Sequence, residues 1–138
     1  RLTLAERTVL DLMFVSDEAI KFYEENIKYF YNEVYRSIAN ILIEDLKVNG
    51  KVDSSMILSE INSNDIKNKD EILSEVSAIT FRKDNTKFSK QTLEDCNKVI
   101  SEERTKIYEK NTLKQQCLGK SPEEQARILK EYITKING

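Results

Sequence analysis

The sequence contains no histidine, no tryptophan, one proline, three glycines and two cysteines among its 138 residues. The lack of histidine excludes Ser-His-Asp and Cys-His catalysis, and it removes the commonest general base and a common zinc ligand. So few glycines leave too few positive-φ positions for the turns of an all-β sandwich or for a phosphate-binding loop. These absences predict an all-α protein that is not an enzyme and holds no cofactor or metal.

The balance of charge excludes a second set of functions. The chain has 24 acidic and 22 basic residues, and a net charge of −2 creates no strong field that would attract DNA or anionic lipid. No run approaches the roughly 18 apolar residues of a membrane-spanning helix, and residues 1–12 lack the pattern of a signal peptide. We expect a cytoplasmic protein that contacts neither membrane nor nucleic acid and is a monomer when alone. Because the sequence opens on Arg1, we also expect a piece of a longer chain.

Two residue types could still carry chemistry, and a structural explanation is favoured for both. Acidic pairs such as Glu44-Asp45 and Glu102-Glu103 could serve acid-base catalysis. In a chain that is 33% charged, however, such pairs normally lie on solvated helix faces. Cys96 and Cys117 lie 21 residues apart without a CxxC motif, which is typical of small buried side chains rather than of a disulfide or a metal site.

Apolar periodicity predicts a helical bundle over residues 1–88. In the first helix the hydroxyl of Thr3 would cap the N-terminus, and Glu6, three residues later, would complete a capping box. Ser16 or Asp17 would then begin a second helix.

The strongest helical signal follows Asn32, which would cap this third helix. Asn49-Gly50 supplies the left-handed stop expected just past a helix C-terminus. Apolar residues cover more than one side of the helix, so we expect it to be buried in the bundle. Asp53 would cap the next short helix, and the polar residues 82–89 would form the boundary with a second subdomain.

A long helix and a C-terminal helical hairpin are predicted over residues 89–138. Ser89 would cap a helix that meets no breaker before about Leu118. At 1.5 Å per residue this helix would span about 43 Å and project beyond a bundle of this size. Gly119 would end it. The last helix has the clearest start, Ser121-Pro122-Glu123-Glu124, with a cap hydroxyl, a proline at the first helical position and a glutamate three residues after the cap.

The last helix carries two apolar strips, one more than a hairpin can bury within itself. One strip comprises Ala126, Leu129, Ile133 and Ile136, and the other comprises Ile128 and Tyr132. If the hairpin projects, the second strip is free to bind a partner helix. If the hairpin folds back on residues 1–88, both strips belong to the core.

The sequence has two candidate nucleic-acid surfaces, and local charge disfavours both. The basic residues of the long helix that could track phosphates are Lys98, Arg104, Lys106, Lys110 and Lys114. Glutamates alternate with them, and i to i+4 pairs such as Glu102 with Lys106 favour a helix stabilised in water. The aromatic stretch Tyr29-Phe30-Tyr31 could stack on single strands, but acidic residues lie among the aromatic ones. We therefore interpret these aromatic residues as part of the core and its rim.

Three segments resemble a pair of related families of bacterial replication proteins. Residues 5–13, AERTVLDLM, resemble the A-E-R/K-x-(L/V)-L-x-x-(M/L) helix of both families. These families are the C-terminal helicase-binding domain of DnaG-type primases and the N-terminal domain of DnaB-type replicative helicases. Residues 30–38, FYNEVYRSI, resemble their F-x-x-x-x-H-R-x-(I/L) helix entry, with Tyr35 where histidine is usual. Residues 50–61, with Asp53 as the cap, are also similar to both.

The C-terminal half resembles the primase family. Leu93-Glu94-Asp95-Cys96 opens a long charged helix, and a short turn and a final helix follow, which is the primase order. That family often has Gly-Asp before its paired glutamates, where this chain has Ser121-Pro122. The resemblance covers essentially the whole chain, and the N-terminal assembly domain of the DnaB-type helicase is the alternative.

The resemblance to primases implies a non-catalytic protein-interaction domain. Its bundle would modulate helicase activity, and its hairpin would dock on the N-terminal domains of the hexameric replicative helicase and so recruit primase to the replication fork. Polymerisation and zinc-dependent template reading would belong to other parts of the primase. The residues expected to bind the helicase are Ile128, Leu129, Tyr132, Ile133 and Ile136, with Lys130 and Lys135 at the rim.

Overall fold

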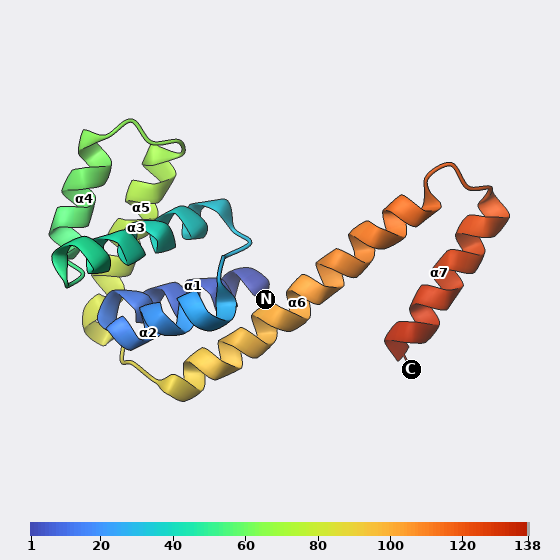
Figure 1. Ribbon diagram of the computed structural model, residues 1–138, viewed down its shortest axis with the longest axis horizontal. Coiled ribbons are helices and arrows are strands. Elements are labelled where there is room, and N and C mark those ends of the chain that lie inside the picture. The colour runs from blue at the N-terminus through green and yellow to red at the C-terminus, as the bar shows by residue number, and fades with distance from the viewer. Residues whose placement is uncertain (138) are drawn as a thin grey trace. The chain divides into compact units, whose positions relative to one another are not determined.

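The computed structural model describes the backbone of residues 1–137 and the side chains of residues 1–135. In this part of the chain the fold is all-α, with seven α-helices and no strand, as predicted (Figure 1). The chain divides into two compact units, residues 1–101 and residues 102–138. The predicted long helix is present as α6, Lys90–Cys117, which begins in the first unit and ends in the second.

The first unit is a bundle of five helices and the first turns of α6. The five helices are α1 Leu2–Val15, α2 Asp17–Phe22, α3 Glu33–Asn49, α4 Ser54–Ser63 and α5 Lys69–Arg82. Helix α2 continues into a π-helical segment, η1 Tyr23–Ile27, and α5 continues into a 3₁₀ turn, η2 Lys83–Asn85. Helix α1 contacts α2, α3 and α5, while α4 and α5 lie side by side (Figure 1).

The core of the bundle is built around α3 and an aromatic cluster. Helix α3 is buried, as predicted, through Ile38, Ala39 and Leu42. The rings of Tyr23 and Phe30 pack with centroids 4.7 Å apart, and burial of such rings is a large part of the energy that stabilises a small bundle. The core also extends past the expected boundary at residue 88, because Leu93 and Ile100 of α6 are buried in the same cluster.

Most of the predicted helix ends are confirmed. The side chain of Asn32 accepts a hydrogen bond from the backbone N–H of Tyr35 at 3.0 Å, and that of Asp53 accepts from two N–H groups of α4. Gly50 adopts φ 74°, the left-handed conformation that ends α3. The hydroxyl of Ser89 accepts from the backbone N–H of Thr92 at 3.2 Å and so caps α6.

The capping box predicted at Thr3 and Glu6 is wrong. Helix α1 begins at Leu2, so Thr3 lies inside it, and no side chain caps its N-terminus. Glu6 is buried instead, and its carboxylate accepts hydrogen bonds from the backbone N–H groups of Tyr31 at 2.5 Å and Asn32 at 3.0 Å. The backbone donors of the segment before α3 need an acceptor, and Glu6 supplies it across the bundle rather than along its own helix.

The prediction that the pair Glu44-Asp45 is solvated is right for only one of the two. Glu44 is exposed, whereas Asp45 is 4% exposed. The Asp45 carboxylate accepts from the side-chain amide of Asn49 at 2.6 Å and from the backbone N–H of Asp53 at 3.1 Å. Asp45 therefore joins the end of α3 to the start of α4.

An ion pair between Asp11 and Arg82 ties α1 to α5. The Arg82 Nε and Nη2 groups donate to the two Asp11 carboxylate oxygens at 3.2 and 2.9 Å. Both side chains are mostly buried, with 17% of Asp11 and 28% of Arg82 exposed. The hydrogen bond to Asp11 raises the pKa of Arg82 above its ordinary value, so the guanidinium stays charged.

Replacing Arg82 with glutamine is expected to lower the free energy of unfolding of the bundle by about 1–3 kcal/mol, because Asp11 would keep its partly buried charge and lose its bidentate partner. Arg82→Lys should lower the free energy of unfolding by less, since lysine restores the positive charge but cannot form the bidentate pair. The matched control is Lys67→Gln, which breaks the exposed pair with Glu33 and should change stability by less than about 0.5 kcal/mol. Urea unfolding followed by circular dichroism at 222 nm measures all three, and equal losses for Arg82→Gln and Lys67→Gln would contradict the assignment.

Candidate functional site

The candidate site is the hairpin of the second unit, formed by the end of α6 and by α7, Pro122–Asn137. Gly119 turns the chain with φ 72°, a left-handed conformation that glycine adopts without a Cβ clash. The backbone N–H of Lys120 donates to the carbonyl of Cys117 at 3.2 Å. The hydroxyl of Ser121 accepts from the backbone N–H of Glu124 at 3.3 Å, so the predicted N-cap of the last helix is confirmed.

Gln125 closes the hairpin from the α7 side. Its side-chain Nε2 donates to the carbonyl oxygens of Cys117 and Lys120, each at 3.2 Å. These carbonyls belong to the end of α6 and to the turn, where helix geometry leaves acceptors without partners. The amide of Gln125 therefore fixes the first turn of α7 against the end of α6, and this fixes which face of α7 looks inward.

The two apolar strips of α7 have different surroundings. Ile128 and Tyr132 are half-buried within the hairpin. Leu129 is 46% exposed and Ile133 is 55% exposed, and Ala126 is also exposed. The hairpin thus uses the strip of Ile128 and Tyr132 for its own packing, and we call the strip formed by Ala126, Leu129 and Ile133 the open strip.

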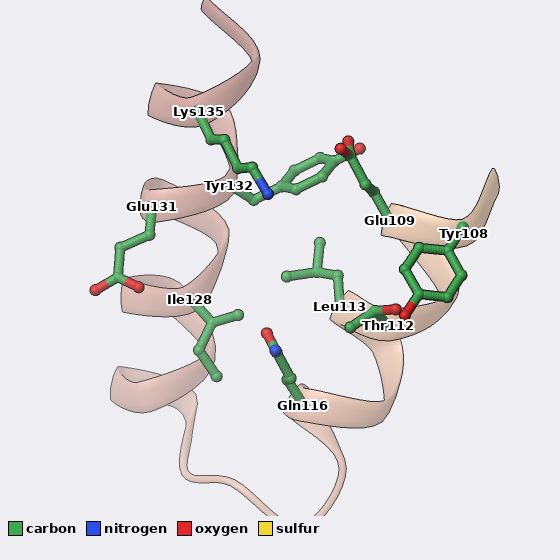
Figure 2. A pocket seen from close by; sticks show the side chains of 9 residues that line it. All are labelled: Tyr108, Glu109, Thr112, Leu113, Gln116, Ile128, Glu131, Tyr132 and Lys135. Atoms are coloured by element: carbon green, nitrogen blue, oxygen red, sulfur yellow. The ribbon is translucent and has the colours of Figure 1, made fainter. Parts of the chain in front are cut away.

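One side of the hairpin is a groove of about 240 Å³, here called the tyrosine groove. Figure 2 shows Leu113 pointing from α6 toward α7 and the ring of Tyr132 extending from α7 toward α6. Its lining residues are Tyr108, Glu109, Thr112, Leu113, Gln116, Ile128, Glu131, Tyr132 and Lys135. Two carboxylates and one ammonium group line it, so this side is weakly acidic.

The other side of the hairpin is a groove of about 340 Å³, here called the lysine groove. Its lining residues are Ile107, Lys110, Asn111, Leu113, Lys114 and Leu129. Leu113 lines both grooves and so forms the ridge between them. Two cations and no anion line this groove, and Leu129 connects it to the open strip.

The structure places the predicted partner-binding residues in three settings. Ile128, Tyr132 and Lys135 line the tyrosine groove. Leu129 lines the lysine groove, and Ile133 and Lys130 are exposed on α7. Ile136 lies outside the residues whose side chains are described. The predicted set is therefore not one surface, because it includes residues from both sides of the hairpin.

The contribution of α6 to the site was missed in the sequence. From the sequence, no role is assigned to Ile107 and Leu113, and Lys110 and Lys114 are interpreted as part of a solvated helix face. A signal was present: no acidic residue occurs between Glu109 and Glu123, whereas basic residues do. A local excess of one charge along a helix is a recognisable pattern, and here it marks the lysine groove.

In residues 1–137 no group of three or more cysteine, aspartate and glutamate side chains is placed to hold a metal ion. Burial, together with the charge of Asp95, raises the pKa of the Cys96 thiol, so the thiol is protonated at neutral pH and is a poor nucleophile. What the hairpin offers is apolar contact and surface charge, which are the means of protein recognition.

A third groove lies in the first unit, along α3 and α5. It has a volume of about 500 Å³, and its lining includes Tyr35, Asp70, Glu71 and Glu75. Burial, followed by the charge of Glu75 and a hydrogen bond to it, raises the pKa of Tyr35. Tyr35 is therefore neutral at any physiological pH.

No helix in the described part of the chain is both long enough and apolar enough to cross a lipid bilayer. Comparisons with protein families, with curated proteins and with solved structures found no match to this chain.

Proposed function

We propose that this chain is the non-catalytic helicase-binding domain of a bacterial DnaG-type primase and acts in the cytoplasm. The observation that carries the proposal is the open strip of α7. Leu129 and Ile133 are about half exposed, whereas Ile128 and Tyr132 on the neighbouring face of α7 are half-buried. An exposed apolar strip beside charged residues is typical of a surface that binds a partner helix.

The bundle supports the proposal through two of the segments that carry the resemblance, residues 5–13 and 30–38. The Glu6 carboxylate binds the backbone N–H groups of Tyr31 and Asn32. The guanidinium of Arg36 donates from Nε to the carbonyl of Phe30 at 2.9 Å and from Nη2 to that of Tyr31 at 3.2 Å. The glutamate of the first motif and the arginine of the second thus hold the same loop, which is a physical reason for the two motifs to occur together.

The function follows from tethering. A domain that holds the catalytic part of primase on the helicase ring raises the local concentration of the primase active site at newly unwound template. The domain itself needs no catalytic residue for this role. The bundle, held beside the ring by the hairpin, would modulate helicase activity.

Binding to the assembled replicative helicase encoded by the same genome tests the proposal. The chain is expected to bind saturably, with a dissociation constant of about 1 µM or tighter, as specific interfaces of standard size do. Isothermal titration calorimetry gives the affinity, and a helicase ring that lacks its N-terminal domains is the matched control, which should not bind. Absence of binding to the intact ring would reject the proposal.

Size-exclusion chromatography with light scattering separates the proposal from its alternative. A primase domain of this kind is expected to run as a monomer over a wide concentration range. An N-terminal assembly domain of a DnaB-type helicase would instead self-associate by itself as its concentration rises. Rings or dimers formed without helicase would favour that alternative.

A further inference from the structure

The two sides of the hairpin differ in charge, and this difference selects a side for the partner. The tyrosine groove contains Glu109 and Glu131 as well as Lys135. The lysine groove contains Lys110 and Lys114 and no acidic residue. A partner that brings carboxylates to the hairpin is therefore attracted to the lysine groove and repelled from the tyrosine groove.

The cations of the lysine groove are available to a partner. Lys110 and Lys114 lie one helical turn apart on α6, so both ammonium groups flank the same groove. Among the described residues neither of them forms an ion pair. A carboxylate of a partner could therefore form an ion pair with these ammonium groups without displacing a carboxylate of the hairpin.

The apolar surface of the groove is continuous with the open strip. Ile107 and Leu113 are half-buried in the lining, and Leu129 joins them from α7. Ile133 lies one turn beyond Leu129, at the i+4 spacing that a partner helix meets on its own apolar face. A groove between two joined helices accepts a third helix whose apolar side chains fill it.

We propose that the lysine groove binds an amphipathic helix of the partner whose apolar face is flanked by aspartate or glutamate residues. This inference rests on the proposed function, since it names the chemistry of the helicase segment that the hairpin recognises. The apolar lining favours a protein helix over nucleic acid, because phosphates would pair with Lys110 and Lys114 but leave Leu129 and Ile133 exposed to water. The bound segment completes a three-helix arrangement with α6 and α7.

The test is a charge reversal with a matched control. The double variant Lys110→Glu and Lys114→Glu places two like charges against the acidic flank, and we expect its affinity for the helicase N-terminal domains to fall about 10- to 100-fold. The control variant Lys51→Glu and Lys120→Glu changes the net charge by the same amount outside both grooves of the hairpin. Its affinity should stay within about 3-fold of the unmodified chain. Because all four lysines are exposed, circular dichroism should show equal helicity for both variants.

Salt dependence is the second readout. The affinity of the unmodified chain should fall as salt rises, whereas that of the Lys110→Glu and Lys114→Glu variant should rise, because salt screens the repulsion that the two glutamates introduce. The control variant should keep the dependence of the unmodified chain. Equal losses in the two variants would mean that net charge rather than the groove matters, and this would overturn the inference.

The outcomes separate this inference from the proposed function. If the unmodified chain does not bind the helicase, both fail. If it binds and the Lys110→Glu and Lys114→Glu variant binds equally well, the lysine groove is wrong while helicase binding stands. Two further experiments measure binding of the chain to a 30-nucleotide single-stranded DNA and self-association of the chain alone. Binding of that DNA through the lysines, or self-association that the same variant abolishes, would replace the acidic helix with nucleic acid or with a second copy and overturn the inference.

Discussion

Replacing Glu6 with alanine is expected to lower the free energy of unfolding of the bundle by about 2–5 kcal/mol, because two backbone donors lose their acceptor in a partly buried site. Glu6 is 1% exposed, so its carboxylate is shielded from water in the folded bundle. The two donors, the N–H groups of Tyr31 and Asn32, stand at the entry to α3, the helix around which the core is built. The effect should therefore reach the whole first unit.

The isosteric variant Glu6→Gln separates the hydrogen bonds from the volume of the side chain. A carboxamide keeps the shape and one acceptor oxygen, but its NH₂ group faces the second N–H, so an intermediate loss is expected. The control is Glu44→Ala, which removes an exposed glutamate of α3 and should change stability by no more than about 0.5 kcal/mol. Urea unfolding followed by circular dichroism at 222 nm and by tyrosine fluorescence compares the three. Losses below 0.5 kcal/mol for Glu6→Ala would show that the loop does not depend on this carboxylate.

The helix ends could be predicted from the sequence because their causes are local. Asn32, Asp53, Ser89 and Ser121 each accept a hydrogen bond from an N–H two or three residues farther along the chain. The relevant partner is therefore inside any short window of sequence. The same reasoning gave Gly50 as a helix stop, since a left-handed residue is needed just past a helix end.

The polar groups that hold helices together could not be predicted in this way. Glu6 binds a segment 25 residues away, and Arg82 binds Asp11 across 71 residues. A carboxylate in the first turn of a helix fits a cap as well as it fits a tertiary contact, and only the packing of α1 against α3 decides between them. Asp45 follows the same rule, because its neighbour Glu44 has the same chemistry and the opposite burial.

The sequence indicated that α7 carries more apolar surface than a hairpin can use, but not which strip is used. Both strips have the spacing of a helix seam. The choice depends on Gln125, whose side chain binds the end of α6 and the turn, and on Leu113, which projects between the helices (Figure 2). These contacts turn Ile128 and Tyr132 inward and leave Leu129 and Ile133 outward.

This orientation determines which variant best tests helicase binding. A double change at Tyr132 and Ile133 would mix the two faces, because Tyr132 is half-buried against α6 and its loss would disturb the hairpin itself. Leu129 and Ile133 both belong to the open strip. Changing these two residues removes apolar contact with the partner and leaves the seam of the hairpin in place.

The double variant Leu129→Ser and Ile133→Ser is therefore expected to bind the helicase N-terminal domains about 100-fold more weakly or worse, since central apolar contacts contribute roughly 1–2 kcal/mol each or more. The midpoint of thermal unfolding should change little, because neither side chain is buried in the free chain. Surface plasmon resonance against immobilised helicase gives the affinity, and the loss should lie mainly in a faster dissociation rate.

Two comparisons identify the strip as the cause. Leu118→Ser removes another exposed leucine, 75% exposed in the turn between the helices, and should leave binding within about 2-fold, since surface positions away from an interface contribute little. Ile128→Ser removes a half-buried apolar side chain of α7 and should lower the helicity of the hairpin as well as the affinity for the helicase. If Leu129→Ser and Ile133→Ser kept full affinity while lowering the unfolding midpoint as Ile128→Ser does, the open strip would be part of the folded core, and helicase binding would have to be assigned to another surface of the chain.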